Sequence, residues 1–149
     1  MRKKRITFVC TGNTCRSPMA EIILKNKLKL AGLTDVRVMS AGLYADEGQK
    51  ISKNSQLALK RLGLKSYSFK SRLLTKEIME KTDIVICMTA SHKAQLSGFN
   101  NVLTMNEITG LGDIIDPYGG DINLYVETMY QIDDACNIIL TKIFEQKGE

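Results

Sequence analysis

Residues 6–18 read ITFVCTGNTCRSP, an apolar run followed by small and polar residues and by a proline that opens a helix-patterned segment. A strand that passes through such a loop into a helix is typical of an anion site, because backbone N–H groups and the helix N-terminus point at one oxyanion. Five residues separate Cys10 from Arg16, so the sulfur, the guanidinium and the N–H groups can converge on a tetrahedral oxyanion. The stretch therefore predicts a phosphate-binding loop whose Cys10 thiolate can attack phosphorus.

The other residues of the loop fit this interpretation. A thiolate is the nucleophilic form of cysteine, and the helix N-terminus, the N–H groups and Arg16 all favour a negative sulfur as they favour phosphate. Gly12 permits a tight turn, and Asn13 is the non-glycine residue type that most readily takes positive φ. Ser17 is expected to cap the helix beside the sulfur, and Pro18 to occupy its first position, where no N–H is needed.

Three motifs together resemble those of a known family, the low-molecular-weight protein tyrosine phosphatases. That family begins with a strand, then Cys-x5-Arg-Ser or Cys-x5-Arg-Thr, then a helix, which Cys10 and Arg16 match. Its Asp-Pro-aromatic element, about a hundred residues downstream, is similar to Asp116-Pro117-Tyr118, and Ser40-Ala41-Gly42 resembles the element whose serine supports the loop asparagine, here Asn13. The resemblance spans most of the 149 residues and implies a flavodoxin-like order of four strands.

Alternating strand-like and helix-like segments predict an α/β fold, with a parallel sheet covered by helices on both faces in one domain of residues 1–149. Strands are expected at about 5–10, 36–40, 83–88 and 101–105, and helices at about 17–31, 51–62, 75–81, 90–97 and 122–145. Gly32 and Gly63 are predicted to end helices with positive φ. In such folds the carboxyl ends of the strands form the ligand crevice, and Cys10 lies at such an end.

Composition and charge exclude several classes of protein. No apolar run approaches the ~18 residues of a membrane-spanning helix, and the run after the basic residues 2–5 is too short for a signal peptide. We therefore expect a cytoplasmic protein without a membrane partner. The net charge of +5 is spread along the chain and aromatic residues make up 6%, which favours a solvated basic surface, with residues 2–5 as a frayed terminus. Nucleic-acid binding is the alternative, and it would be salt-dependent.

Asp116 is the predicted proton donor and acceptor. Displacing a leaving group from phosphorus needs a proton on the departing atom, and the same carboxylate can then activate the water that releases inorganic phosphate. Flanking glycines predict that the segment around Asp116 is mobile. Asp113 lacks the Pro-aromatic context and is the weaker candidate, and an ordinary Asp-Pro turn is the alternative interpretation.

Thr14 and Tyr118 bear on specificity. Tyrosine-specific members of the family usually carry isoleucine or leucine where Thr14 stands, whereas residues 10–21, CTGNTCRSPMAE, resemble the bacterial protein arginine phosphatases. A hydroxyl at Thr14 and a carboxylate at Asp116 suit a polar, cationic phosphoguanidinium, whose bridging nitrogen would take the proton. Tyr118 is expected to form one wall. Phosphoarginine in proteins is thus the predicted substrate, with phosphotyrosine as the alternative.

The four cysteines form no disulfide framework, which fits a reducing compartment. Cys15 is close enough in sequence to Cys10 for a reversible disulfide after attack by peroxide, a protective role that the resemblance supports. The alternative is that Cys15 is a small residue contributing an N–H to the loop. Cys87 and Cys136 are predicted core residues. His92 is predicted to be a surface histidine, and no metal or cofactor is expected.

Other functions remain open at this stage. A thioredoxin-coupled arsenate reductase would need two further neighbouring cysteines, and only Cys87 lies in the relevant segment. A phosphate-binding module without turnover would need neither Cys10 nor Asp116. We predict a monomeric enzyme that acts on phosphorylated proteins. Its predicted catalytic residues are Cys10, Arg16 and Asp116, its substrate and phosphate contacts are Thr11, Gly12, Asn13, Thr14, Cys15, Ser17 and Tyr118, and its loop supports are Asn13 and Ser40.

Overall fold

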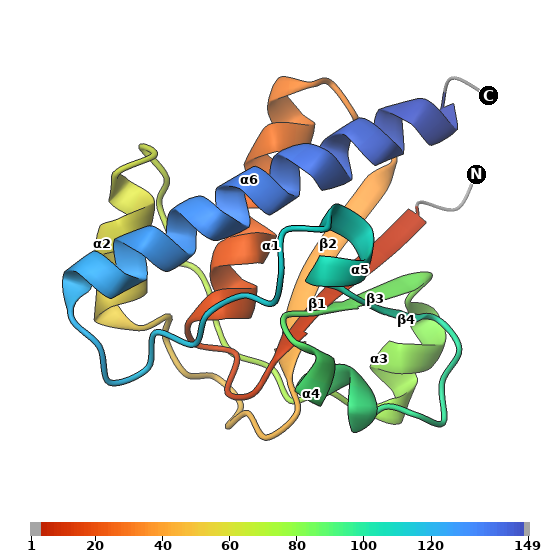
Figure 1. The fold of residues 1–149 in the computed structure, drawn as a ribbon, viewed down its shortest axis with the longest axis horizontal. Coiled ribbons are helices and arrows are strands. Elements are labelled where there is room, and N and C mark those ends of the chain that lie inside the picture. The colour runs from red at the N-terminus through yellow and green to blue at the C-terminus, as the bar shows by residue number, and fades with distance from the viewer. Residues whose placement is uncertain (1–3, 148–149) are drawn as a thin grey trace.

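Four parallel strands form the centre of the computed structural model, which describes residues 4–147. Their order is β2-β1-β3-β4, as Figure 1 shows, which confirms the predicted parallel sheet. The elements follow one another as β1 (Lys4–Cys10), α1 (Arg16–Leu30), β2 (Val36–Gly42), α2 (Lys53–Lys60), α3 (Lys76–Lys81), β3 (Ile84–Cys87), α4 (Ala90–Ala94), β4 (Val102–Thr104), α5 (Met105–Thr109) and α6 (Ile122–Lys147).

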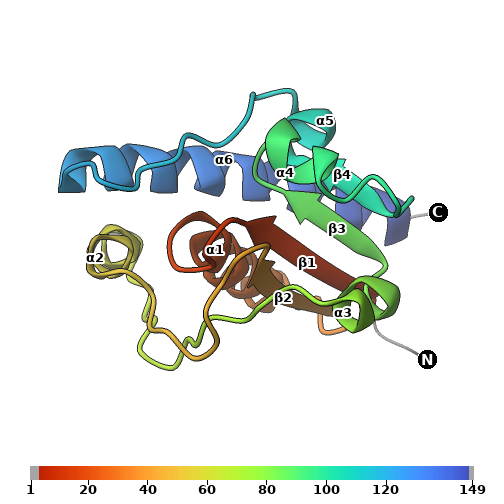
Figure 2. The ribbon, with the colours of Figure 1, turned by 90° about the horizontal axis from the view of Figure 1, so that it is seen from below.

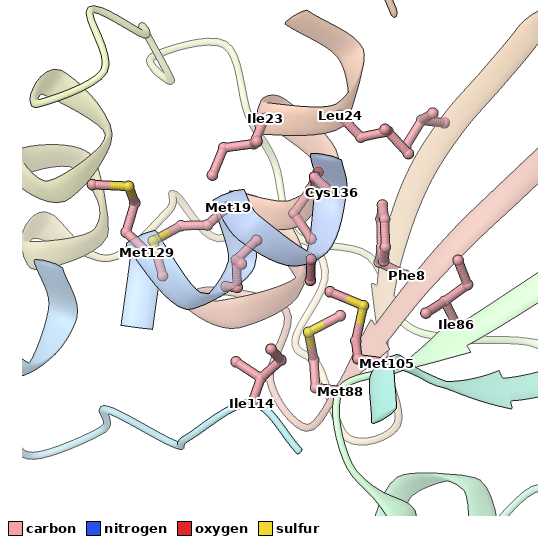
Figure 3. Packing of buried hydrophobic residues seen from close by; sticks show 14 of the residues in the cluster. Phe8, Met19, Ile23, Leu24, Ile86, Met88, Met105, Ile114, Met129 and Cys136 are labelled. Carbon is pink, nitrogen blue, oxygen red and sulfur yellow. The ribbon is translucent and has the colours of Figure 1, made fainter. Parts of the chain in front are cut away.

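Alternate side chains of β1 serve two separate cores, because successive residues of a strand point to opposite faces of the sheet. Phe8 packs in the larger cluster with residues of α1 and α6, while Val9 packs in a smaller cluster with Met79 of α3. Figure 3 shows Phe8 and Ile86 of the sheet beside side chains of α1 and α6 in the larger core. The predicted helices on both faces of the sheet are confirmed.

The long helix α6 crosses α1 and reaches α2 at its N-terminal end (Figures 1 and 2). Its buried residues recur at spacings of three and four, as a helix that covers one face of a sheet requires. Between residues 4 and 147 no helix is both long and apolar enough to cross a membrane.

Several predicted boundaries differ by one to three residues from those of the structure, and one helix was missed. The largest difference is the end of α4, at Ala94 instead of about 97. The fourth strand stops at Thr104, because Thr104 and Glu107 form a reciprocal capping box that starts α5. This signal, Thr-x-x-Glu, is readable in the sequence. Helix α2 begins later than expected because Ser52 caps it, accepting a hydrogen bond from the Ser55 N–H. Gly32 and Gly63 both have a φ of 72°, as predicted.

Part of the basic N-terminal run, residues 2–5, lies in the sheet. Lys4 and Arg5 belong to β1, and the Arg5 N–H donates to Asp83 Oδ2 at 2.7 Å, so for these two residues the frayed-terminus prediction is wrong. Arg2 and Lys3 lie outside the described residues.

Gly42, at the carboxyl end of β2, lets the loop after β1 approach the sheet. A Cβ at this position would lie 2.6 Å from the Thr11 carbonyl oxygen and 2.9 Å from the Asn13 nitrogen, and both are backbone atoms that cannot move aside. The next two N–H groups, of Leu43 and Tyr44, donate to the carbonyls of Cys10 and Thr11 at 3.0 and 2.9 Å. The end of β2 thereby fixes the start of the loop.

Candidate active site

The loop of residues 11–15 joins β1 to α1 in the conformation that its residue types predict. Asn13 has a φ of 56° and is the one non-glycine residue with positive φ in the range 4–147. Helix α1 begins at Arg16, with Cys15 at its N-cap and no side-chain cap. The prediction that Ser17 caps the helix is therefore wrong, as is the placement of Pro18 at the first helical position. The Ser17 hydroxyl is engaged instead with the sulfur of Cys10.

Cys10 Sγ lies 2.8 Å from Ser17 Oγ, and both residues are buried. Ser17 Oγ also accepts a hydrogen bond from Asn13 Nδ2 at 2.8 Å. Since an amide nitrogen donates and cannot accept, the hydroxyl hydrogen of Ser17 is left for the sulfur. This chain of hydrogen bonds stabilises a thiolate at Cys10, next to the N-terminus of a 15-residue helix.

A pocket of about 280 Å³ opens above the sulfur. Eight residues line it: Cys10, Thr11, Gly12, Thr14, Cys15, Arg16, Asp116 and Tyr118. All eight were predicted site residues. Asn13 and Ser17 were predicted as phosphate contacts but do not line the pocket. Their side chains are buried away from it, where they support the loop.

Asn13 is the centre of that support. Its Nδ2 donates to Ser40 Oγ at 2.9 Å, which is the contact that the resemblance implied, and its Oδ1 accepts from the Arg72 N–H at 2.8 Å. Ser40 Oγ in turn donates to Glu21 Oε1 at 2.7 Å, and Glu21 pairs with Lys25. Arg72 holds Asn13 through its backbone N–H, and its Nη1 also donates to the Ser40 carbonyl at 3.5 Å.

Arg16 spans the pocket between the loop and the Asp116 segment. Its side chain is 6% exposed, and its Nη1 donates to the Ile114 carbonyl at 3.1 Å. Its Nη2 lies 3.7 Å from Asp116 Oδ2, but the Asp116 side chain is 60% exposed, so this ion pair contributes little to stability. A bound phosphate can therefore replace the carboxylate on Arg16 at small cost.

The segment before Asp116 is tied down more firmly than its glycines predicted. Gln131 of α6 donates from Nε2 to the Asp113 carbonyl at 2.8 Å and accepts from the Ile115 N–H at 3.1 Å. The Asp113 carboxylate accepts from the Ala90 N–H at 3.2 Å, so it points away from the pocket. Gln131 is a residue that sequence reasoning missed, because its partners are backbone atoms distant in the chain.

His92 lies inside the protein, and the prediction of a surface histidine is wrong. Its side chain connects Thr11 of the loop, whose Oγ1 is 2.9 Å from Nε2, to Thr89 at the start of α4, whose Oγ1 is 3.0 Å from Nδ1. Burial, assisted by the positive charge of Arg16, lowers the pKa of His92 to about 4, so the imidazole is neutral. The Thr-x-x-His spacing of a helix start was the signal that the sequence offered.

Cys15 faces residues of two helices. Its Sγ is 3.5 Å from Ser52 Oγ at the start of α2 and 3.6 Å from the Tyr125 hydroxyl on α6. Burial and the neighbouring Cys15 raise the pKa of Tyr125 to about 12. Neither Ser52 nor Tyr125 was a predicted site residue. Cys10 and Cys15 are both free thiols in this structure.

Cys87 and Cys136 are core residues, as predicted. Both are fully buried, and burial raises the pKa of each thiol, that of Cys87 to about 12. A thiol held neutral in this way is a poor electron relay, so Cys87 gives the arsenate reductase alternative no support.

Residues 5–148 match the low molecular weight phosphotyrosine protein phosphatase family. The chain belongs to this family. A protein-arginine-phosphatase of Bacillus subtilis is 41% identical over 138 residues, which cover 87% of this chain and 89% of the relative. A low molecular weight protein-tyrosine-phosphatase, PtpB of Staphylococcus haemolyticus, is 38% identical over 133 residues, covering 86% of this chain and 91% of the relative. This low molecular weight phosphatase has bacterial relatives with both names.

Solved structures agree with this membership of the low molecular weight phosphatase family. The YwlE arginine phosphatase from Geobacillus stearothermophilus superimposes with a TM-score of 0.89 at 35% identity, covering 97% of this chain and 95% of that one. A YwlE arginine phosphatase mutant in which serine replaces the active-site cysteine, with that serine phosphorylated, has a TM-score of 0.87 at 36% identity, covering 93% and 95%. The chain is a cysteine-dependent protein phosphatase with the four-stranded fold of this family.

Proposed function

We propose that this phosphatase hydrolyses phosphoarginine in proteins through a cysteinyl-phosphate intermediate. The observation that carries the proposal is the hydroxyl of Thr14 on the wall of the phosphate pocket, at the position where tyrosine-specific members usually carry an aliphatic residue. A phosphoguanidinium presents N–H donors and positive charge, which the Thr14 hydroxyl and the carboxyl group of Asp116 accommodate and an aliphatic wall does not. Relatives named protein-arginine-phosphatase at 41% and 40% identity support the proposal.

In the first step, the Cys10 thiolate attacks phosphorus while Arg16 and the N–H groups of the loop hold the phosphoryl oxygens. The P–N bond breaks, Asp116 delivers its proton to the bridging nitrogen, and arginine leaves as a guanidinium. Ser17 holds the thiolate before attack through its 2.8 Å contact with Cys10 Sγ. The protonated nitrogen is a good leaving group, so this step demands less of the acid than a phenolic ester would.

In the second step, the Asp116 carboxylate takes a proton from water, which attacks the cysteinyl-phosphate. The S–P bond breaks, inorganic phosphate leaves and the Cys10 thiolate is regenerated. Asn13 and Ser40 keep the loop in shape through both steps, and Thr11, Gly12, Thr14 and Cys15 surround the phosphate. Tyr118, whose ring is exposed beside the pocket, supplies an outer wall against the substrate protein.

The remaining parts of the proposal concern the protein as a whole. We place residues 1–149 in one phosphatase domain that acts as a monomer in the cytoplasm, on phosphorylated protein substrates and without a cofactor. The solvated basic surface, with a net charge of +5, would attract acidic phosphoproteins and need not bind nucleic acid or membrane.

The test compares kcat/KM for a phosphoarginine peptide and a phosphotyrosine peptide of the same sequence. We expect the wild type to prefer phosphoarginine, Thr14→Ile to lose or invert this preference, and Thr14→Ser, which keeps the hydroxyl, to retain it. Preference of the wild type for phosphotyrosine would assign the chain to the tyrosine phosphatases, the second candidate that the PtpB relatives support.

Two variants test the mechanism separately from specificity. Cys10→Ser should abolish turnover while phosphate binding partly survives, because Arg16 and the N–H groups remain. Asp116→Ala should slow hydrolysis of a phosphotyrosine analogue at neutral pH by about 10²–10⁴-fold, the usual contribution of a general acid. Full activity of either variant would refute the assigned roles.

A further inference from the structure

His92 is a buried polar side chain that the two chemical steps do not use. It comes from α4 and reaches Thr11, the residue that follows the nucleophile and lines the phosphate pocket. The backbone of Thr11 is already fixed, since its carbonyl accepts from the Tyr44 N–H at 2.9 Å. What His92 adds is control over the Thr11 hydroxyl.

The hydrogen bonds of Thr89 decide which nitrogen of His92 carries the proton. Thr89 Oγ1 accepts from the His92 backbone N–H at 3.3 Å as the cap of α4, and the same oxygen lies 3.0 Å from Nδ1. Within the described part of the chain, Nδ1 is a protein acceptor within reach of the hydroxyl hydrogen of the half-buried Thr89. Thr89 Oγ1 already accepts from the His92 N–H, so its hydroxyl hydrogen is assigned to Nδ1 and the proton of the neutral ring to Nε2.

A proton on Nε2 fixes the role of Thr11. Nε2–H donates to Thr11 Oγ1 across 2.9 Å, so the oxygen of Thr11 acts as acceptor towards His92 and its own hydrogen is free. That hydrogen can turn into the pocket towards an anion. With the proton on Nδ1 instead, Thr11 would donate to the ring and present only lone pairs to a phosphate, which repel it.

We propose that His92 is a positioning residue, which donates from Nε2 to Thr11 Oγ1 and so directs the Thr11 hydroxyl hydrogen at a phosphoryl oxygen. The Thr11 side chain is thereby a phosphate ligand in addition to the backbone N–H groups. The ring stays neutral because burial and Arg16 lower the pKa of His92 to about 4, although the carboxylates of Asp113 and Asp116 act in the opposite direction. This inference rests on the proposed function for the identity of the anion.

Two substitutions of His92 separate the two contacts of the ring. The amide nitrogen of His92→Gln stands near the place of Nε2 and can still donate to Thr11, whereas the shorter amide of His92→Asn reaches only the level of Nδ1 and Thr89. The measurement is the dissociation constant of inorganic phosphate, by titration calorimetry on the full chain, with kcat and KM as a second readout. The melting temperature of each variant is also measured. If His92 had only a structural role, the loss of phosphate affinity in each variant would parallel the drop in its melting temperature.

We expect His92→Gln to bind phosphate like the wild type, and His92→Asn to bind it about threefold to tenfold more weakly, the effect of one hydrogen bond. Thr11→Val should weaken binding by a similar factor and Thr11→Ser should not. The double variant of His92→Asn and Thr11→Val should bind no more weakly than Thr11→Val alone, because both remove the same interaction.

Several results would overturn the inference. His92→Gln binding as weakly as His92→Asn would mean that the ring matters only for packing, and multiplying effects in the double variant would mean that the two residues act separately. Thr11 is exposed, so Thr11→Val folds and decides the matter even if His92→Asn does not fold: unchanged phosphate binding in Thr11→Val excludes the hydroxyl as a ligand. Failure of the wild type to bind phosphate would instead refute the proposed function.

Discussion

Asn13→Ala tests whether one buried amide holds the phosphate loop together. Asn13 makes three hydrogen bonds, to Ser17 at 2.8 Å, to Ser40 at 2.9 Å and from the Arg72 N–H at 2.8 Å. Each such bond contributes about 0.5–1.5 kcal/mol, and removing the acceptor also leaves the Arg72 N–H without this partner. Alanine at a φ of 56° adds about 1–2 kcal/mol of strain that asparagine largely avoids.

Together these terms predict that Asn13→Ala lowers the free energy of unfolding by about 3–6 kcal/mol. Ser40→Ala removes the bond from Asn13 and the bond to Glu21 without backbone strain, so its cost should be about 1–3 kcal/mol. The measurement is urea denaturation followed by circular dichroism, with the slope checked for constancy between variants.

A matched control separates the loop from stability in general. Asn101 also uses its side-chain amide on the backbone, donating to the carbonyls of Met79 and Thr82 at 3.2 and 2.9 Å, and it does not line the phosphate pocket. Asn101→Ala should therefore lower stability while leaving phosphate affinity unchanged, whereas Asn13→Ala should lower both. The reasoning is wrong if Asn13→Ala is no more destabilising than Ser40→Ala, or if it binds phosphate normally.

Three further predictions follow from single contacts. Gly42→Ala should lower the free energy of unfolding by about 1–3 kcal/mol, because the added Cβ would overlap the backbone of the loop. Gly98→Ala is the control, since open space surrounds that position, and equal melting temperatures of the two variants would contradict the prediction. The pKa of His92 is lowered in the folded protein, so its contribution to stability is present above pH 6.5 and is lost as the pH falls towards 4. Between pH 6.5 and 4, the free energy of unfolding measured in urea should therefore fall more steeply for the wild type than for His92→Gln, by up to about 1.4 kcal/mol per pH unit. Parallel plots of this free energy against pH would refute the prediction. Cys15→Ser should remain active but fail to regain activity after peroxide and reductant, and recovery equal to that of the wild type would exclude a protective disulfide with Cys10.

The sequence predicted much of this protein because its strongest signals are local. Periodicity placed the sheet and the major helices, and the spacing from Cys10 to Arg16 predicted a strand, a loop and a helix around one anion. The positive φ of Asn13 also followed from residue type alone, since few residues other than glycine tolerate it. Helix α5, which was not predicted, also begins at a local signal, the capping box at Thr104.

What supports the loop could not be read in this way, because the partners are distant in the chain and act largely through their backbones. The Arg72 N–H reaches Asn13 across 59 positions, and Gln131 holds the segment before Asp116 by two backbone groups. No pattern of side-chain types encodes such contacts. They exist only once the segment of Arg72, helix α6 and the loop have been brought together by packing.

His92 shows the division most clearly. The sequence by itself predicted a surface histidine near a helix start, without a second ligand. The tertiary structure brought it within 2.9 Å of Thr11, 81 positions earlier, and buried it beside Arg16. Burial and the positive charge of Arg16 lower its pKa to about 4. Local spacing determines which groups can do chemistry, whereas burial and long-range contacts determine their protonation and direction, because desolvation and hydrogen-bond geometry depend on the packed surroundings.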